Sequence, residues 1–448
     1  MSERKGYDMG KATFRGGIHM YDGKELSKDK PTTVLLPKGE LVFPMSQHIG
    51  APAKPIVTVG DRVLAGQRIG EAQGFVSAHV ISSVSGTVKA IEQRPTVSGA
   101  MCESIVIEND GAYKTVEGFG VKRDYTKLSK EEIRQYVKEA GIVGMGGAGF
   151  PTHIKLTPKK DDAIDYVIVN GAECEPYLTS DYRMMLEESK KIVGGLKIML
   201  RLFEKAQGII LIEDNKPEAI KKLSELVKNE ERITVKSAKT KYPQGAERQI
   251  INVATGRKIN SSMLPADAGC VVNNVDTVIS VYMAVAESTP LIRRIITVTG
   301  DAIADPQNFS VRTGTNYTEL VEAAGGFKTP PEKVISGGPM MGLALFRLDL
   351  PVTKTSSALL AMAKDEAAAL PTSPCIRCGR CVSVCPSRLV PQRMMEYAEH
   401  FDNAGFLGLD GMECYECGTC TYVCPAGRRL TQAFKQTRRS ILDERRKK

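Results

Sequence analysis

Two cysteine runs of identical spacing near the end of the chain constrain its structure more than any other feature. Each run has the pattern C-x-x-C-x-x-C-x-x-x-C-P, and together they contain eight of the eleven cysteines. Three thiolates at this spacing can hold three corners of a [4Fe–4S] cube, and a fourth cysteine from elsewhere completes the ligand set. The spacing therefore predicts two cubane clusters. The two runs are Cys375, Cys378, Cys381 and Cys385 before Pro386, and Cys414, Cys417, Cys420 and Cys424 before Pro425.

Structural zinc and disulfide bonds are the alternatives for so many cysteines. Zinc sites usually pair a C-x-x-C with a distant C-x-x-C or with two histidines, and neither run is built in that way. Disulfides suit small secreted domains, whereas the N-terminus has charged residues without the apolar core of a secretory signal. We therefore interpret the runs as cluster ligands, and we expect a cytoplasmic protein that moves single electrons.

Both runs resemble those of two-cluster bacterial ferredoxins, in which the fourth cysteine of each run ligates the other cluster. Carried onto this chain, the resemblance implies two crossed ligand sets within a helical, ferredoxin-like domain over residues 371–448. The first cysteine set is Cys375, Cys378, Cys381 and Cys424, and the second cysteine set is Cys385, Cys414, Cys417 and Cys420.

The length, hydropathy and charge of the chain limit the number of its domains and the kinds of partner that it can have. A length of 448 residues allows about three domains, and no apolar run reaches the ~18 residues that a membrane-spanning helix needs. The net charge of +9 is concentrated in residues 428–448. We interpret that stretch as a solvated helix end, or as a surface for an acidic partner protein or anionic lipid. Nothing resembles a nucleic-acid recognition motif, so no nucleic-acid partner is expected.

The N-terminal part predicts an arm followed by a small β domain. Residues 1–30 are polar and glycine-rich, including Phe14-Arg15-Gly16-Gly17-Ile18-His19, and predict an extended arm. Residues 31–120 alternate apolar positions with glycine and aspartate turns, which is typical of a small sandwich or barrel. This stretch resembles the biotinyl/lipoyl-type barrel-sandwich hybrid. Carrier domains of that type need a lysine at a hairpin tip, and the corresponding segment, 78–83, has none. We expect the fold without the carrier function.

Residues 121–265 predict an α/β domain. A capping-box signature begins a helix over 129–140. Alternating elements follow, with strands over 163–169, 208–212 and 233–235 and helices over 181–203 and 216–227, which favours a parallel sheet. Polar residues just beyond the ends of such strands are placed where open α/β sheets bind ligands.

A glycine-rich loop, Gly144–Lys155, lies between the first helix and the first strand of this domain. Dense glycine lets the backbone approach a phosphate with its N–H groups, and Lys155 can neutralise the charge. The loop is neither a P-loop nor G-x-G-x-x-G, and a tight turn alone would explain it equally. Towards the C-terminus, residues 266–350 regain strand character around a helix at 317–324, and the alanine-rich segment 351–370 predicts a linker helix. Within the cluster domain, helices are expected over 391–400 and 430–442.

Four segments resemble, in the same order, the flavin- and NADH-binding segments of the NADH-oxidising flavoprotein subunit of respiratory complex I. They are Gly146–Lys155, Asn170–Pro176, Tyr242–Glu247 and Asn273–Thr277. With the lysine-free barrel before them and the cluster runs after them, the chain resembles the C subunits of Rnf electron-transport complexes along essentially its whole length. The resemblance implies a multidomain α/β plus β protein: a barrel-sandwich hybrid, a Rossmann-like FMN/NADH domain, a β-grasp domain of the soluble-ligand-binding type, and the two-cluster domain. The glycines of the β-grasp domain are expected to make turns.

The resemblance also implies the ligands and their contacts. FMN would be bound non-covalently, and NAD(H) would be the substrate. Nucleotide contacts are implied for Phe150, Glu175 and Glu247. FMN contacts are implied for Gly144, Gly146, Gly147, Lys155, Asn170, Cys174, Tyr242, Gly245, Asn273 and Asn274.

The implied function is that of a peripheral subunit at the cytoplasmic face of the cell membrane. It would pass electrons between NAD(H), FMN and the clusters, while partner subunits couple ferredoxin:NAD oxidoreduction to ion transport. Ferredoxin or another iron–sulfur subunit is an expected partner. A soluble flavin/iron–sulfur reductase, such as a cobalamin reductase, is the alternative. A relay module without nucleotide chemistry is a third hypothesis, which the intact loop with Glu175 and Glu247 opposes.

Purely structural roles would also explain three of the site residues. Cys174 would serve equally as an ordinary buried thiol. Glu175 would cap a turn before Pro176, and Glu247 would begin a helix, where acidic residues are common.

Overall fold

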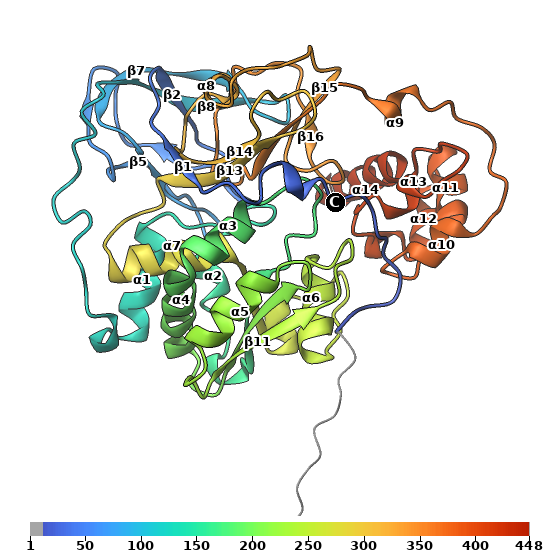
Figure 1. Cartoon of the computed structure of the whole chain (residues 1–448), viewed down its shortest axis with the longest axis horizontal. Helices are drawn as coiled ribbons and strands as arrows, with labels where there is room; N and C mark the ends of the chain where they lie inside the picture. The colour runs from blue at the N-terminus through green and yellow to red at the C-terminus, as the bar shows by residue number, and fades with distance from the viewer. Residues whose placement is uncertain (1–11, 448) are drawn as a thin grey trace, which may run out of the picture.

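The computed structural model describes residues 12–447 and places them in four parts (Figure 1). Two small antiparallel sheets form a barrel-like domain. One has the strand order β2 (Glu40–Pro44), β8 (Met101–Asn109), β7 (Gly86–Pro95) and β4 (Arg62–Val63). The other has the order β3 (Lys54–Pro55), β5 (Arg68–Glu71) and β6 (Val80–Ile81). Apolar side chains from both sheets meet in one buried core, as the alternating pattern predicted.

The second part is the predicted parallel sheet. Its strand order is β11 (Ile233–Ala238), β10 (Gln207–Glu213), β9 (Tyr166–Gly171) and β12 (Cys270–Asn274), and every neighbouring pair is parallel. The capping box of α1 (Lys130–Glu139) is present, since Ser129 and Glu132 exchange hydrogen bonds. The predicted helix over 181–203 is instead two helices, α3 (Ser180–Glu187) and α4 (Ser189–Leu202), which meet at Glu188. The other helices are α2 (Thr152–Lys155), α5 (Pro217–Leu226), α6 (Glu247–Thr255) and α7 (Val275–Ala286).

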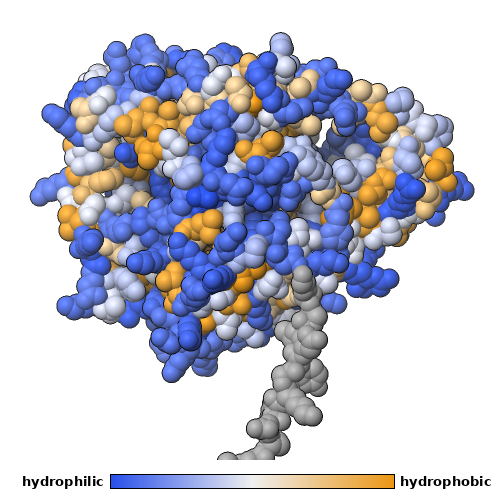
Figure 2. Space-filling view, viewed as in Figure 1, coloured by the Kyte–Doolittle hydropathy of each residue, from blue (hydrophilic) through white to orange (hydrophobic). Residues whose placement is uncertain are grey.

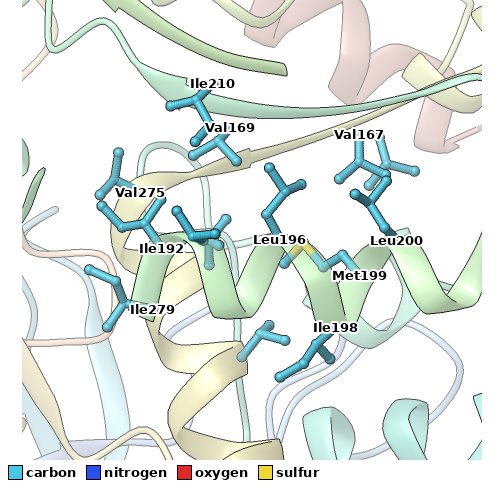
Figure 3. Close-up of a cluster of buried hydrophobic side chains, with 14 of the residues drawn as sticks. Val167, Val169, Ile192, Leu196, Ile198, Met199, Leu200, Ile210, Val275 and Ile279 are labelled. Carbon is cyan, nitrogen blue, oxygen red and sulfur yellow. The ribbon is translucent and has the colours of Figure 1, made fainter. Parts of the chain in front are cut away.

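Helices cover both faces of this sheet. Figure 3 shows Leu196 and Leu200 of α4 pointing toward Val167 and Val169 of β9. The intervening residue Ile168 belongs to the core on the opposite face, which α6 closes. Successive strand residues point to opposite faces, so the buried middle of β9, Val167–Val169, needs an apolar residue at every position. This requirement explains the continuous run that predicted a buried strand.

The predicted boundary at 265/266 is wrong. Strand β12 pairs with β9 in the α/β sheet, and α7 packs on α4, so the domain continues to Ala286. The two helices can approach closely because Gly195 of α4 has no side chain. A Cβ at this position would lie only 2.2 Å from the backbone oxygen of Val278 in α7.

A six-stranded sheet forms the third part. It includes two strands that lie outside the predicted limits of this domain, 266–350. Its order is β1 (Thr33–Leu35), β14 (Gln307–Arg312), β13 (Arg293–Thr299), β17 (Ala358–Met362), β15 (Lys333–Ser336) and β16 (Leu343–Ala344), with α8 (Tyr317–Ala323) beside it. Strand β1 was expected in the barrel domain, but it pairs with β14. Strand β17 lies where a linker helix was expected.

Burial explains the failure of the linker prediction. Residues Ala358–Ala361 are fully buried, and β17 is hydrogen-bonded to β13 on one side and β15 on the other. Tertiary pairing of this kind overrides the helix propensity of alanine and leucine. Only α9 (Glu366–Ala369) is helical within the predicted linker.

The cluster domain is helical, as predicted, and lies on the right in Figure 1. It contains α10 (Arg380–Val384), α11 (Pro391–Glu399), α12 (Asn403–Gly408), α13 (Thr419–Tyr422) and α14 (Leu430–Lys447). Phe406 and Phe434 pack in its core with ring centroids 5.8 Å apart. Among residues 12–447, no helix is long and apolar enough to cross a membrane. On the face shown in Figure 2, apolar residues are scattered among hydrophilic ones.

Candidate functional site

The structure gathers the eight cysteines of the two runs into two separate groups of four. One hollow is lined by Cys375, Cys378, Cys381 and Cys424. The other is lined by Cys385, Cys414, Cys417 and Cys420. These groups are the first and second cysteine sets, each with its fourth member from the other run. In the described part of the chain, no group of three or more His, Cys, Asp or Glu is arranged to hold a single metal ion. The thiols surround a space instead, which suits a cluster of several atoms.

The two cysteine sets differ in exposure. Cys375 and Cys378 are exposed, whereas Cys417 and Cys420 are buried. Burial raises the pKa of Cys414 and of Cys420 to about 12. Metal ligation requires the thiolate, so bound iron must supply the positive charge that makes these buried thiolates favourable.

The glycine-rich loop leaves an open backbone surface before α2. The N–H of Gly144 donates to the Phe150 carbonyl at 2.8 Å, which closes the loop. A Cβ on Gly147 would touch nothing, whereas one on Gly146 would lie 2.8 Å from Cβ of Asn274. Glycine is therefore needed at 146 for close packing, while the backbone at 147 faces open space.

The predicted flavin residues converge at the carboxyl edge of the parallel sheet. The Asn170 side chain donates to the Gly245 carbonyl at 2.9 Å, and the N–H of Gly245 donates to the Cys174 thiol at 3.3 Å. Asn273 and Asn274 end the neighbouring strand β12. Since β9 and β12 are parallel, their ends bring these loops together.

Several buried polar atoms at this edge have no hydrogen-bond partner. They are Oδ1 of Asn273, Oγ1 of Thr152 and both side-chain amide atoms of Gln244. Unpartnered buried polar groups are costly in a folded protein. Such atoms, next to a loop of exposed backbone N–H groups, fit a bound polar molecule such as FMN.

Cys174 is half-buried, and desolvation raises the pKa of its thiol far above the ordinary value. The protonated thiol accepts the Gly245 N–H. This environment agrees with the packing explanation, and it still leaves the sulfur at the edge where the flavin residues meet.

The two glutamates expected to contact the nucleotide have different surroundings. The carboxylate of Glu175 accepts the N–H groups of Met340 at 3.2 Å and Met341 at 2.9 Å, from the loop after β15. Burial raises the pKa of Glu175 to about 7. Glu247 begins α6 and pairs with Lys155 at 3.3 Å, and its side chain is 44% exposed. Lys155 also donates to the Val272 carbonyl at 3.2 Å.

A half-buried acidic side chain that the sequence did not single out forms a hydrogen bond with Asn274 at this edge. Asp181 of α3 accepts a hydrogen bond from the Asn274 side chain at 2.7 Å. Burial raises the pKa of Asp181 to about 7, and the nearby Glu173 acts in the same direction. The N–H of Asp276 donates to the Asn274 side-chain oxygen at 2.9 Å, and the Asp276 carboxylate pairs with the buried Arg294. These contacts fix the orientation of the Asn274 amide.

The interface between the flavin loops and the second cysteine set had no sign in the sequence. The Tyr242 hydroxyl, buried in this interface, donates to the Cys417 carbonyl at 2.7 Å. Arg248 pairs with Glu413 at 2.6 Å, and Gln249 donates to the Tyr415 hydroxyl at 3.1 Å. These contacts join residues more than 160 positions apart, and no local pattern could have revealed them.

The raised pKa of Glu175 predicts a pH-dependent stability. Between its ordinary pKa of about 4.3 and about 7, the folded protein keeps a proton that the unfolded chain has lost. Its contribution to stability is therefore present below this window and is lost as the pH rises through it. Replacing Glu175→Gln should flatten the fall in melting temperature between pH 5 and 8, by an amount worth about 3 kcal/mol at most.

Thermal unfolding of the cofactor-loaded parent and variant across this pH range provides the measurement. Parallel pH profiles for the two proteins would show that Glu175 does not titrate in this window.

Comparisons with known families assign the parts of the chain. Family models match a barrel sandwich hybrid domain of RnfC over residues 12–112, a Nuo51 FMN-binding domain over 137–283, an SLBB domain over 295–344 and a 4Fe-4S dicluster domain over 374–428. The expected domain types, and the expected FMN and two [4Fe–4S] clusters, are thereby confirmed.

Similar proteins are known over most of the chain. It is 46% identical to the C subunit of the proton-translocating ferredoxin:NAD(+) oxidoreductase complex of Clostridium ljungdahlii, over 85% of this chain and 83% of that protein. It is 45% identical to the C subunit of the Na(+)-translocating ferredoxin:NAD(+) oxidoreductase complex of Acetobacterium woodii, over 97% and 98% respectively. A solved NAD+-reducing [NiFe]-hydrogenase is similar over 72% of this chain and 62% of the matched chain, at 17% identity and a TM-score of 0.49.

Proposed function

This chain belongs to the family of C subunits of ion-translocating ferredoxin:NAD(+) oxidoreductase complexes, and from that premise we propose what each of its parts does. The chain is an oxidoreductase subunit that passes electrons between NAD(H), FMN and two [4Fe–4S] clusters. Its partners are the other subunits of the complex, to which ion transport belongs. Because its relatives over almost the full length are members of such complexes, the soluble cobalamin-type reductase is not favoured.

We propose that FMN lies at the carboxyl edge of the parallel sheet. When bound, FMN exchanges electrons singly or in pairs, which links the two-electron chemistry of NAD(H) to one-electron clusters. The backbone N–H groups of the glycine-rich loop and Lys155 would hold its phosphate. The unpartnered side-chain oxygen of Asn273, Oδ1, would supply a further polar contact. Asn170, Cys174, Tyr242, Gly245 and Asn274 would form the surrounding wall, in which Asp181 fixes Asn274.

The two glutamates would have different roles, with Glu247 contacting the nucleotide and Glu175 positioning a loop. Glu247 is partly exposed, so it can turn from Lys155 to accept hydrogen bonds from the substrate. The half-buried Phe150, on the same loop as Gly147, would offer a ring face for stacking. Glu175 is already bonded to two backbone N–H groups, so its main contribution would be to hold the loop after β15 against the flavin domain.

The hydrogen bond from the Tyr242 hydroxyl to the Cys417 carbonyl is the main observation that supports the proposed order of electron transfer. It places the second cysteine set beside a flavin loop, and Cys174 packs in the same apolar group as Cys417. The cluster of the second set would therefore exchange electrons with FMN. The more exposed first set would exchange electrons with a partner, which includes ferredoxin or another iron–sulfur subunit. We place the protein peripherally at the cytoplasmic face, where NAD(H) is found.

Crossed ligation predicts which cluster each fourth cysteine supports. Replacing Cys385→Ala should damage the cluster of Cys414, Cys417 and Cys420, because Cys385 lines that hollow. Replacing Cys424→Ala should damage the other cluster. EPR spectra of dithionite-reduced protein provide the measurement, with Cys102→Ala, outside both sets, as the control. The reverse pattern of losses would show that the sets are not crossed.

The nucleotide assignment is tested by NADH reduction of the anaerobic protein, in which NADH should bleach both flavin and cluster absorbance. Replacing Glu247→Gln should lower kcat/KM for NADH about ten- to hundred-fold, the effect of losing a charge-assisted hydrogen bond. FMN content should not change. Glu204→Gln is a matched control, since Glu204 pairs with Lys130 on a distant exposed surface. Parent-like NADH kinetics in Glu247→Gln would refute the contact, and loss of flavin would make the residue structural.

A further inference from the structure

The N-terminal arm lies between the flavin domain and the cluster domain. Figure 1 shows the dark-blue start of the described chain passing beside the cluster domain before it reaches the sheets. The N–H of Gly17 donates to the Val384 carbonyl at 2.8 Å, one residue before Cys385 of the second set. On its other side, Ile18 exchanges backbone hydrogen bonds with Tyr242 at 2.9 and 3.0 Å. One short segment therefore binds a cluster-ligand loop and a flavin loop at once.

Two consecutive glycines allow this close fit. Gly16 has φ +87° and Gly17 has φ +75°, in the left-handed region that favours glycine. A Cβ on Gly16 would lie 2.7 Å from the Cys385 carbonyl oxygen, and one on Gly17 would lie 2.7 Å from the Tyr242 carbonyl oxygen. Both neighbours are backbone atoms, so neither can rotate aside. Any side chain at position 16 would push the arm and the Cys385 loop apart.

Buried side chains anchor the segment at both ends. The Phe14 side chain is buried. The Lys241 ammonium donates a hydrogen bond to the Phe14 carbonyl at 2.8 Å and lies 4.6 Å from the centre of the Phe14 ring. Ile18 is buried in one apolar group with Tyr242 and Cys417. The segment is therefore anchored on both sides of Gly16 and Gly17, and its position helps to fix the positions of the two loops that it joins.

We infer that residues 14–18 are a positioning element that holds the cluster of the second cysteine set at its distance from the flavin, and thereby sets the rate of electron transfer between them. Residues 14–18 contribute no member of either cysteine set, so the arm acts through the Cys385 and Tyr242 loops. This inference rests on the proposed order of electron transfer.

The test separates the partial reactions of the full-length, cofactor-loaded protein. In Gly16→Ala, NADH should bleach the flavin absorbance at the parent rate, because the nucleotide side of the site is untouched. Reduction of the clusters by the flavin should slow at least about tenfold, since small displacements have large effects on reaction rates. Iron, sulfide and FMN contents should equal those of the parent. Gly74→Ala is the control, because Gly74 also has positive φ, at +71°, but open space around its Cβ position.

A second variant covers the case in which Gly16→Ala does not retain its cofactors. Lys241→Met removes only the hydrogen bond to Phe14 and the contact with its ring, and it should show the same selective slowing. Cluster reduction at the parent rate in a cofactor-complete variant would overturn the inference. Failure of NADH to bleach the flavin of the parent would instead overturn the proposed function.

Discussion

The buried contact between the Tyr242 loop and the Cys417 loop is the constraint on which the rest of the structure depends. Covalently, the cluster domain follows β17 through a single segment that contains only the short α9 (Figure 1). Such a segment cannot fix one domain against another. The fixed position comes from the Tyr242 hydroxyl, the Arg248–Glu413 pair and the arm at Gly17, which all contact the second cysteine set or its flanking residues.

Buried charges reinforce this junction. Lys24, which lies further along the arm, donates to the Glu175 carbonyl at 3.1 Å, and its ammonium lies 3.5 Å from the Glu173 carboxylate. Glu175 in turn holds the loop of Met340, and a Cβ on Gly418 of the second run would lie 3.2 Å from the Met340 side chain. Charges taken out of water must be paired or hydrogen-bonded to be tolerated. Four parts of the protein therefore meet at one junction: the arm, the flavin domain, the six-stranded sheet and the cluster domain. Both hydrogen bonds and apolar contacts join them there.

Local sequence rules predicted the parts of the protein better than their boundaries. Cysteine spacing is a local property, and so is the capping box of Ser129 and Glu132, and both predictions agree with the structure. Strands β1, β12 and β17 were misplaced because their partners are distant in sequence: a strand's sheet is decided by pairing, which composition does not encode. The flavin residues were named through a resemblance, whereas the hydrogen bond from Tyr242 to Cys417 required the fold. The surroundings of Glu175 were likewise invisible, because Met340 belongs to another domain.

The order in which the two clusters are reduced tests the central claim most directly. Protein mixed with NADH and frozen after increasing times can be followed by EPR, with the two cluster signals assigned from variants of the individual cysteine sets. The signal of the second set, which contains Cys417, should rise first, and that of the first set, which contains Cys375, should follow. Earlier reduction of the first set would contradict the proposal that the Tyr242–Cys417 contact is the point where electrons leave the flavin.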